Sequence, residues 1–167
     1  MKKIIERRLS LKNYDTHIRL YIGLDGALLH SSTTQNILPI LRCDAEDEEQ
    51  VVHMIGLYCG PKSKPTDANE FLKMFVDETK EIVTNGFQYD EQSLYSVCVH
   101  GIICDAPGRA FVLCTKFHGG FHSCSKCEAK GKYYRSVSFP DTVSTLRTDE
   151  KFKAHEYNED YQMVKLF

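Results

Sequence analysis

A near-continuous apolar segment in the second half of the chain restricts the fold more than any other feature. The segment is LYSVCVHGIIC, residues 94–104, and it is rich in aliphatic and β-branched side chains. Such a run is typical of a central strand in a parallel sheet that is covered on both faces. It ends on Asp105, and the Ala-Pro-Gly that follows stops a strand. We therefore expect a fully buried strand that turns at Asp105 into a short helical segment over 108–116.

The segment before this strand predicts an amphipathic helix with a defined start and end. Asp67 can cap the first turn with Glu70 as its capping-box partner, and Asn85-Gly86 can end the helix. A helix that connects two strands in this way makes the second strand parallel to an earlier one. The apolar stripe of the predicted helix consists of Phe71, Leu72, Phe75, Val76, Ile82 and Val83.

Three further strands are predicted before the helix, over residues 17–32, 36–45 and 51–60. Because the links between them are short, they should form an antiparallel meander. The expected fold is therefore α/β with a mixed sheet: three antiparallel strands, a helix and a parallel strand. This order is the opening topology of the ribonuclease H-like fold, in which the first and fourth strands are neighbours.

Two aspartates would meet in this topology. Asp25 lies on the first strand and Asp105 at the end of the fourth, so their carboxylates could share Mg²⁺ or Mn²⁺. Such ions relieve the repulsion between the carboxylates, activate a water or hydroxyl, and stabilise the leaving oxygen at a phosphodiester. Each aspartate also has a structural interpretation. Asp25-Gly26 is a strong two-residue hairpin signal, and Asp105 before Ala-Pro-Gly is typical of a strand end or a helix cap.

A cysteine and histidine cluster follows in KFHGGFHSCSKC, residues 116–127. Cys124 and Cys127 have the two-residue separation that lets both thiolates reach one tetrahedral zinc ion. A redox pair and two unligated thiols are the alternatives. The candidates for the remaining zinc ligands are His118 or His122 nearby, and His155 or, more weakly, Cys114 at longer range.

The segment KGKYYRSVSF, residues 130–139, combines basic and aromatic side chains. Lys130, Lys132 and Arg135 could contact a phosphate backbone while the two tyrosines stack on bases. As a solvated β-hairpin, the same segment needs no ligand. The net charge of −2 gives no chain-wide signal for nucleic acid, so any such contact must come from a local patch.

No apolar run approaches the roughly 18 residues that a membrane span requires. The N-terminal segment has charges but no apolar h-region of a signal peptide. The sequence therefore predicts a soluble intracellular protein without a membrane partner. Its cysteines are expected to be reduced or metal-bound.

Several segments together resemble one known family. They are GLDGALLHSS, NILPILRC, MIGLYCGPKSKPTDANEFLKMFVDE, ICDAPGRAFVLCTKFHGGFHSCSKCEAKGKY and FPDTVSTLRTDEKF, and they span residues 17 to 155. In them the chain resembles the transposase-domain proteins of invertebrate genomes, which are related to the transposases of CACTA (En/Spm) DNA elements. The most specific part is the block that runs from CDAPGRAF through HGGF and the two cysteines to GKY.

The resemblance implies a ribonuclease H-like core with a DDE/D set of carboxylates, which cuts and joins DNA strands with two Mg²⁺ or Mn²⁺ ions. The family's first two acidic residues fall on Asp25 and Asp105. Its His-x5-Cys-x2-Cys pattern falls on His118, Cys124 and Cys127, which favours His118 over His122 as a zinc ligand. The implied partner is DNA at transposon ends, the implied location is the nucleus, and the full-length protein could be a homo-oligomer.

The sequence also departs from this family. A complete enzyme needs a third Asp or Glu from a later helix and a separate domain that binds DNA ends, and neither is recognisable. The acidic residues after position 148 lie in a polar stretch without an apolar stripe, which is typical of a solvated tail. The expected segments are an N-terminal extension (1–16), a partial catalytic core (17–117), a zinc-knuckle insertion (118–140) and a polar C-terminal segment (141–167).

The sequence is therefore interpreted as a transposon-derived DDE/D transposase fragment that is inactive alone. One alternative is a non-catalytic, zinc-containing module that binds DNA or protein. The other is a self-contained metal-dependent nuclease that uses Asp25, Asp105 and one C-terminal carboxylate.

Overall fold

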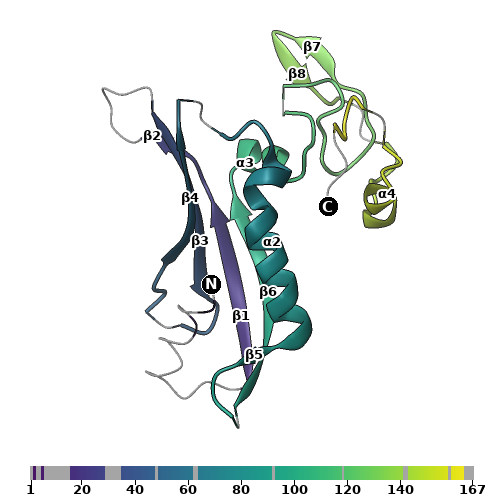
Figure 1. The fold of residues 1–167 in the computed structure, drawn as a ribbon. Coiled ribbons are helices and arrows are strands. Elements are labelled where there is room, and N and C mark those ends of the chain that lie inside the picture. The colour runs from purple at the N-terminus through teal and green to yellow at the C-terminus, as the bar shows by residue number, and fades with distance from the viewer. Residues whose placement is uncertain are drawn as a thin grey trace. The chain divides into compact units, whose positions relative to one another are not determined.

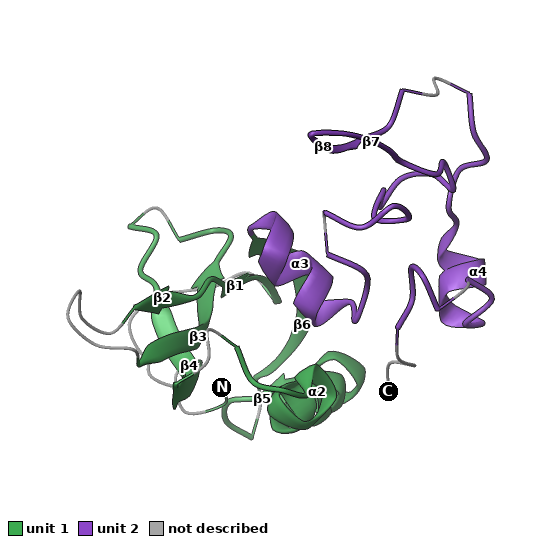
Figure 2. Cartoon of the chain, turned by 90° about the horizontal axis from the view of Figure 1, so that it is seen from above, with its two compact units in different colours: residues 1–104 green, residues 105–167 purple. Residues whose placement is uncertain are grey.

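The chain forms two compact units, residues 1–104 and residues 105–167, which Figure 2 colours separately. The boundary between Cys104 and Asp105 lies inside the predicted segment 17–117. The structure is a computed structural model. It describes residues 2, 5, 16–28, 35–47, 49–61, 64–91, 93–117, 119–140, 143–157 and 159–163.

Within the described residues, the first unit is a six-stranded mixed sheet with the helix α2 (Figure 1). Its elements are β1 (His17–Leu24), β2 (Ala27–Leu28), β3 (Asn36–Asp44), β4 (His53–Gly60), α2 (Ala68–Asn85), β5 (Phe87–Gln88) and β6 (Leu94–Cys104). Strands β1, β3 and β4 form an antiparallel meander, and β6 pairs with the other side of β1 in parallel. The predicted mixed sheet and its order of elements are therefore confirmed.

The core lies on one face of the central strands. Every second side chain of β1 is buried, as expected for a strand with one covered face: Ile18, Leu20, Ile22 and Leu24. The neighbouring strand β3 buries an ion pair in the same sheet, with Arg42 Nη1 3.0 Å from Asp44 Oδ1. The side chains of Arg42 and Asp44 are 0% and 3% exposed.

The prediction that β6 is buried on both faces was wrong. Val97 is buried, but Ile102 and Ile103 are 53% and 61% exposed. Helix α2 packs along β6 (Figure 1), and consecutive strand residues point to opposite faces. An apolar sequence indicates that both faces of a strand are apolar, but it does not show whether another element covers each face.

Helix α2 starts and ends where the sequence predicts. The Asp67 side chain accepts hydrogen bonds from the backbone N–H groups of Asn69 and Glu70, at 2.8 and 3.3 Å. At the other end, Gly86 has φ 76°, and its N–H donates to the Ile82 carbonyl at 2.9 Å. A side chain at position 86 would be strained in this left-handed conformation.

A bulge in β6 sets the register of the central parallel pair. Leu20 stands opposite Val99 but Tyr21 stands opposite Gly101, so His100 is the extra residue. The His100 ring packs edge-on against the Tyr21 ring, with centroids 5.0 Å apart. A Cβ at position 101 would approach the Tyr21 ring to 3.3 Å, so the glycine accommodates this close packing.

The second unit contains little regular structure. Its elements are α3 (Ala106–Val112), β7 (Lys132–Tyr134), β8 (Ser136–Ser138) and α4 (Asp149–Lys153). Isolated bridges join Thr115 to Gln162 and Cys127 to Leu146, which ties the C-terminal segment to the middle of the unit. In the described part of the chain, no helix is both long enough and apolar enough to cross a membrane.

The substitution Asp67→Ala should lower the free energy of unfolding by about 1 kcal/mol, because the first turn of α2 loses its acceptor. Urea denaturation followed by far-UV circular dichroism measures this change. The control Asp77→Ala removes an exposed carboxylate of the same helix, whose ion pair with Lys73 is also exposed, and should cost less than about 0.5 kcal/mol. Equal losses in the two variants would contradict the capping role.

Candidate functional site

Asp25 lies in a break within a strand and not at the tip of a hairpin. Strands β1 and β2 both pair with β3 in one register, with Leu24 opposite Ile40 and Ala27 opposite Ile37. The two strands are therefore one extended segment that is interrupted at Asp25 and the glycine after it. The hairpin interpretation of Asp25-Gly26 was wrong.

The opposite strand explains this interruption. By the same register, Pro39 of β3 stands opposite Asp25, and proline has no N–H to contribute to a strand ladder. Asp25 is exposed. Its carboxylate is therefore accessible to a ligand from solvent.

Asp105 caps helix α3, which confirms its structural interpretation. Its Oδ1 accepts a hydrogen bond from the backbone N–H of Gly108 at 2.5 Å, and Pro107 occupies the first turn of the helix. A carboxylate has two oxygens with about four lone-pair sites, so one capping bond leaves capacity for a cation. Asp105 is exposed as well.

The pairing of β1 with β6 aligns the two residues that directly precede Asp25 and Asp105. Leu24 and Cys104 stand opposite each other in the parallel pair of β1 and β6, and Asp25 and Asp105 are the next residues along the chain. Without the bulge, Leu24 would stand opposite Ile103. Ligands of α/β proteins bind beyond the carboxyl ends of parallel strands.

Cys124 and Cys127 lie side by side in the second unit, with their Sγ atoms 3.4 Å apart and both residues half-buried. Burial opposes ionisation of the Cys124 thiol, but hydrogen bonds from the backbone N–H groups of Lys126 and Cys127 stabilise its thiolate. The pKa of Cys124 is therefore lowered. Two adjacent cysteine sulfurs are suitable ligands for a soft metal ion.

Among the described residues, the other candidate zinc ligands do not join the cysteine pair. His118 lies outside the described residues. The His122 Nε2 lies 4.0 Å from Asp160 Oδ2, and the buried His155 Nδ1 has no hydrogen-bond partner among the residues that the structure describes. Among the residues that the structure describes, no group of three or more His, Cys, Asp or Glu could hold a metal ion, so neither His155 nor Cys114 completes a set with the cysteines.

Arg147 holds the turn around Cys124, and sequence analysis missed this role. Its Nε donates to the Cys124 carbonyl at 3.0 Å, and its Nη2 donates to the His122 carbonyl at 3.4 Å. The guanidinium carbon lies 3.4 Å from the centroid of the Tyr161 ring and 4.6 Å from that of Tyr157. Both tyrosines are buried. The guanidinium thus joins the cysteine turn to the C-terminal segment.

The basic segment forms a short hairpin, as its solvated interpretation predicted. Strands β7 and β8 pair in antiparallel register, with Arg135 between them at φ 65°. Lys130 and Lys132 are exposed, and the two tyrosines of β7 are each 67% exposed. Cationic and aromatic side chains therefore lie together on an accessible surface.

The C-terminal acidic residues are all exposed: Asp149, Glu150, Glu156, Glu159 and Asp160. The segment that carries them is nevertheless packed, because Tyr157, Tyr161 and Gln162 are buried. Asp149 and Glu150 occupy the first turn of α4, where a carboxylate interacts favourably with the helix dipole. The carboxylates are exposed to solvent as predicted, but the prediction of a solvated tail was wrong, because the segment that carries them is packed.

The substitution Arg147→Ala should destabilise the second unit by about 2 kcal/mol, because two carbonyl groups lose a charged donor and two aromatic rings lose a stacked cation. Hydrogen exchange at the amides of Glu128 and Arg147, which donate to Thr145 and Lys126, measures the loss of protection. The control Lys153→Ala removes an exposed cation of the same unit and should leave protection unchanged. Normal protection in the Arg147 variant would contradict this role.

Comparisons with known proteins do not assign the chain to a family. No family model, no curated protein and no solved structure matches it. Its function is therefore inferred from its residues and from their placement in the fold.

Proposed function

We propose that the chain carries part of the ribonuclease H-like catalytic core of a DDE/D transposase, with Asp25 and Asp105 as two of the three catalytic carboxylates. The observation that carries this proposal is the parallel pairing of Leu24 with Cys104, since each is followed directly by one of these aspartates. The activity of the intact parent would be metal-dependent cleavage and transfer of DNA strands.

The order of strands supports the same proposal. Across the sheet the strands run β4, β3, β1 and β6, with β6 parallel to β1 and the others antiparallel to their neighbours. This is the order that the sequence resemblance implies for the first half of a ribonuclease H-like core. It explains why two acidic residues 80 positions apart in the sequence both follow strands at the centre of the sheet.

The chemistry of the two aspartates suits a hard cation. Carboxylate oxygens are the ligands that Mg²⁺ and Mn²⁺ prefer. When bound, the metal would activate a water or hydroxyl and stabilise the leaving oxygen of a phosphodiester. The bond from the Gly108 N–H would fix the orientation of the Asp105 carboxylate, which keeps its second oxygen available. The third carboxylate is not assigned, so we expect the chain alone to bind metal without cleaving DNA.

The cysteine pair suits a structural zinc ion. Two thiolates on one tetrahedral zinc, with Zn–S bonds of ~2.3 Å, lie about 3.8 Å apart. The 3.4 Å between the Cys124 and Cys127 sulfurs needs only a small opening to reach this value. We propose His118 as the third ligand on the basis of the resemblance. The fourth ligand is not assigned, because among the described residues His155 does not form a metal-binding group with the cysteines.

The second candidate function is a non-catalytic module that binds DNA or protein through the hairpin of β7 and β8. Its support is the exposure of Lys130, Lys132 and Arg135 beside two exposed tyrosines. Cations position a phosphate backbone, and aromatic rings stack on unpaired bases. A hairpin of this kind would bind single-stranded nucleic acid with a strong dependence on salt.

The substitution Asp105→Asn should weaken Mn²⁺ binding at least ~tenfold, because asparagine still caps a helix but lacks the charge that binds the ion. Asp25→Asn should have the same effect. Electron paramagnetic resonance of free Mn²⁺ measures the affinity. The matched control is Asp67→Asn, which alters the other helix-capping aspartate and should leave Mn²⁺ affinity unchanged. Unchanged affinity in both the Asp25 and Asp105 variants would refute the proposed metal site.

A nicking assay on supercoiled plasmid DNA distinguishes an inactive transposase fragment from a self-contained nuclease. We expect no nicking by the chain alone in Mn²⁺. Nicking that disappears in the Asp25→Asn variant would instead favour a complete nuclease.

The purified chain should contain about one zinc ion. Cys124→Ser and Cys127→Ser should each lose the metal, because a serine hydroxyl is a poor ligand for zinc. Elemental analysis by mass spectrometry measures the content. Cys98→Ser is the control, since Cys98 is an exposed cysteine of β6. If the purified wild-type chain contains no zinc, the proposed zinc knuckle is refuted.

A further inference from the structure

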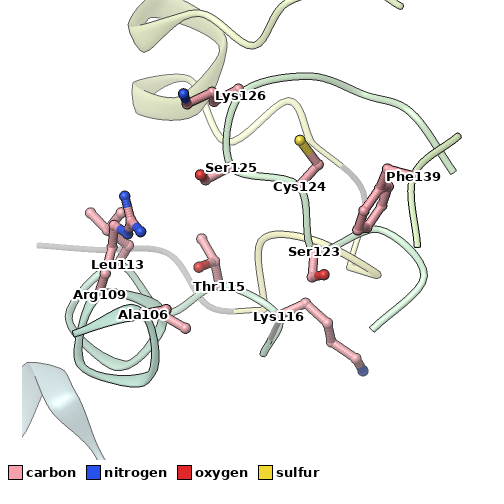
Figure 3. A pocket seen from close by; sticks show the side chains of 11 residues that line it. Ala106, Arg109, Leu113, Thr115, Lys116, Ser123, Cys124, Ser125, Lys126 and Phe139 are labelled. Atoms are coloured by element: carbon pink, nitrogen blue, oxygen red, sulfur yellow. The ribbon is translucent and has the colours of Figure 1, made fainter. Parts of the chain in front are cut away.

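A cavity in the second unit has a lining that favours an anion. Its volume is about 320 Å³, and its walls come from helix α3, the chain that follows it and the turn around Cys124 (Figure 3). The cationic lining residues are Arg109, Lys116 and Lys126, and the hydroxyl groups come from Thr115, Ser123 and Ser125. The lining consists only of residues that the structure describes, and it contains no Asp or Glu.

Several polar side chains line one side of the cavity. Figure 3 shows the guanidinium of Arg109 extending from α3 toward the turn that carries Ser125 and Lys126, with the Thr115 hydroxyl below. Lys116 points away from this group on the other side. An arginine fork, an ammonium group and two hydroxyls are donors that match the oxygens of a tetrahedral anion.

A second cavity of about 340 Å³ shares this wall. Arg109, Leu113, Ser125 and Lys126 line both cavities, and Arg147 lines the second. Arg147 already donates to two backbone carbonyls. In the part of the chain that the structure describes, neither Arg109 nor Lys126 forms an ion pair, whereas Lys151 pairs with Glu128.

The surrounding sequence gives the cavity a positive field. Residues 105–147 contain seven Lys or Arg and three Asp or Glu, although the whole chain has a net charge of −2. The Cys124 side chain also lines the cavity, and its thiolate would contribute one negative charge. The three lining cations exceed that charge, so the local potential remains favourable for an anion.

We propose that this cavity binds a phosphate group, with Arg109 and Lys126 as the charged ligands and with Ser125 and Thr115 as hydroxyl donors. Arginine binds phosphate through two parallel hydrogen bonds, and lysine adds a point charge. The phosphate group belongs either to a free anion or to the backbone of a nucleic acid. The site contains neither Asp25 nor Asp105 and needs no catalytic metal, so phosphate binding is independent of the proposed transposase activity.

The test is calorimetric titration of the full chain, in buffer without Mg²⁺ or Mn²⁺, with two probes. The probes are inorganic phosphate and a single-stranded DNA oligonucleotide without terminal phosphate. The double variant Arg109→Gln, Lys126→Gln should bind at least ~tenfold more weakly, because two charged hydrogen-bond donors are lost. The matched control Lys80→Gln, Lys153→Gln removes two exposed charges elsewhere and should bind as the wild type does.

The two probes distinguish the sources of the phosphate group. Binding of inorganic phosphate that weakens in the double variant supports the site and indicates a free anion. Binding of the oligonucleotide alone, with the same weakening, supports it and indicates a nucleic-acid backbone. The proposal is overturned if the wild type binds neither probe, or if the double variant and the lysine control bind equally well.

A measurement on the wild-type chain removes any dependence on the folding of the variant. In two-dimensional NMR spectra, the bound probe should shift the amide signals of Thr115, Ser125 and Lys126 most strongly. Shifts confined to the hairpin of β7 and β8, or to the first unit, would overturn the assignment of the site to this cavity.

Discussion

The parallel pairing of β1 with β6 is the constraint on which the proposed catalytic site depends. Strand β1 lies at the centre of the sheet and buries one whole face, so its position is determined by the core. Strand β6 is then aligned to it by the bulge at His100, which the Tyr21 ring and Gly101 accommodate. A shift of one residue would change both the facing residues and the face to which each side chain points. The alignment of Leu24 with Cys104 at the ends of the two strands therefore depends on the packing around His100.

The second unit is stabilised in a different way. Its described residues form few regular elements, and isolated bridges and the guanidinium of Arg147 are among the contacts that join its parts. Small units with limited cores often depend on metal ions for stability. The carbonyl groups that Arg147 contacts belong to the same turn as Cys124, so the charged side chain and a metal at the cysteines would stabilise the same segment. The proposed zinc ion would therefore stabilise a segment that Arg147 already holds.

The sequence predicted those features that depend on local chemistry. The cap at Asp67, the stop at Gly86 and the meander follow from residue types and spacing, and the structure confirms them. Features that depend on contacts between distant segments were not predictable. The register at His100, the break at Asp25 opposite Pro39 and the exposure of Ile103 all depend on which strand or helix packs alongside. Arg147 was missed for the same reason, since nothing near it in the sequence indicates that its hydrogen-bond acceptors lie more than twenty residues away.

The turn that carries Cys124 links the two proposed ligand sites of the second unit. Ser125 and Lys126 lie between the two cysteines, and they also line the cavity that we assign to a phosphate group. A zinc ion at the cysteines would neutralise thiolate charge beside that cavity, which strengthens its attraction for an anion. It would also hold the turn in one conformation, so that less conformational entropy is lost when the anion binds. The metal would therefore act on phosphate affinity through the charge and the rigidity of one short turn, without contacting the anion.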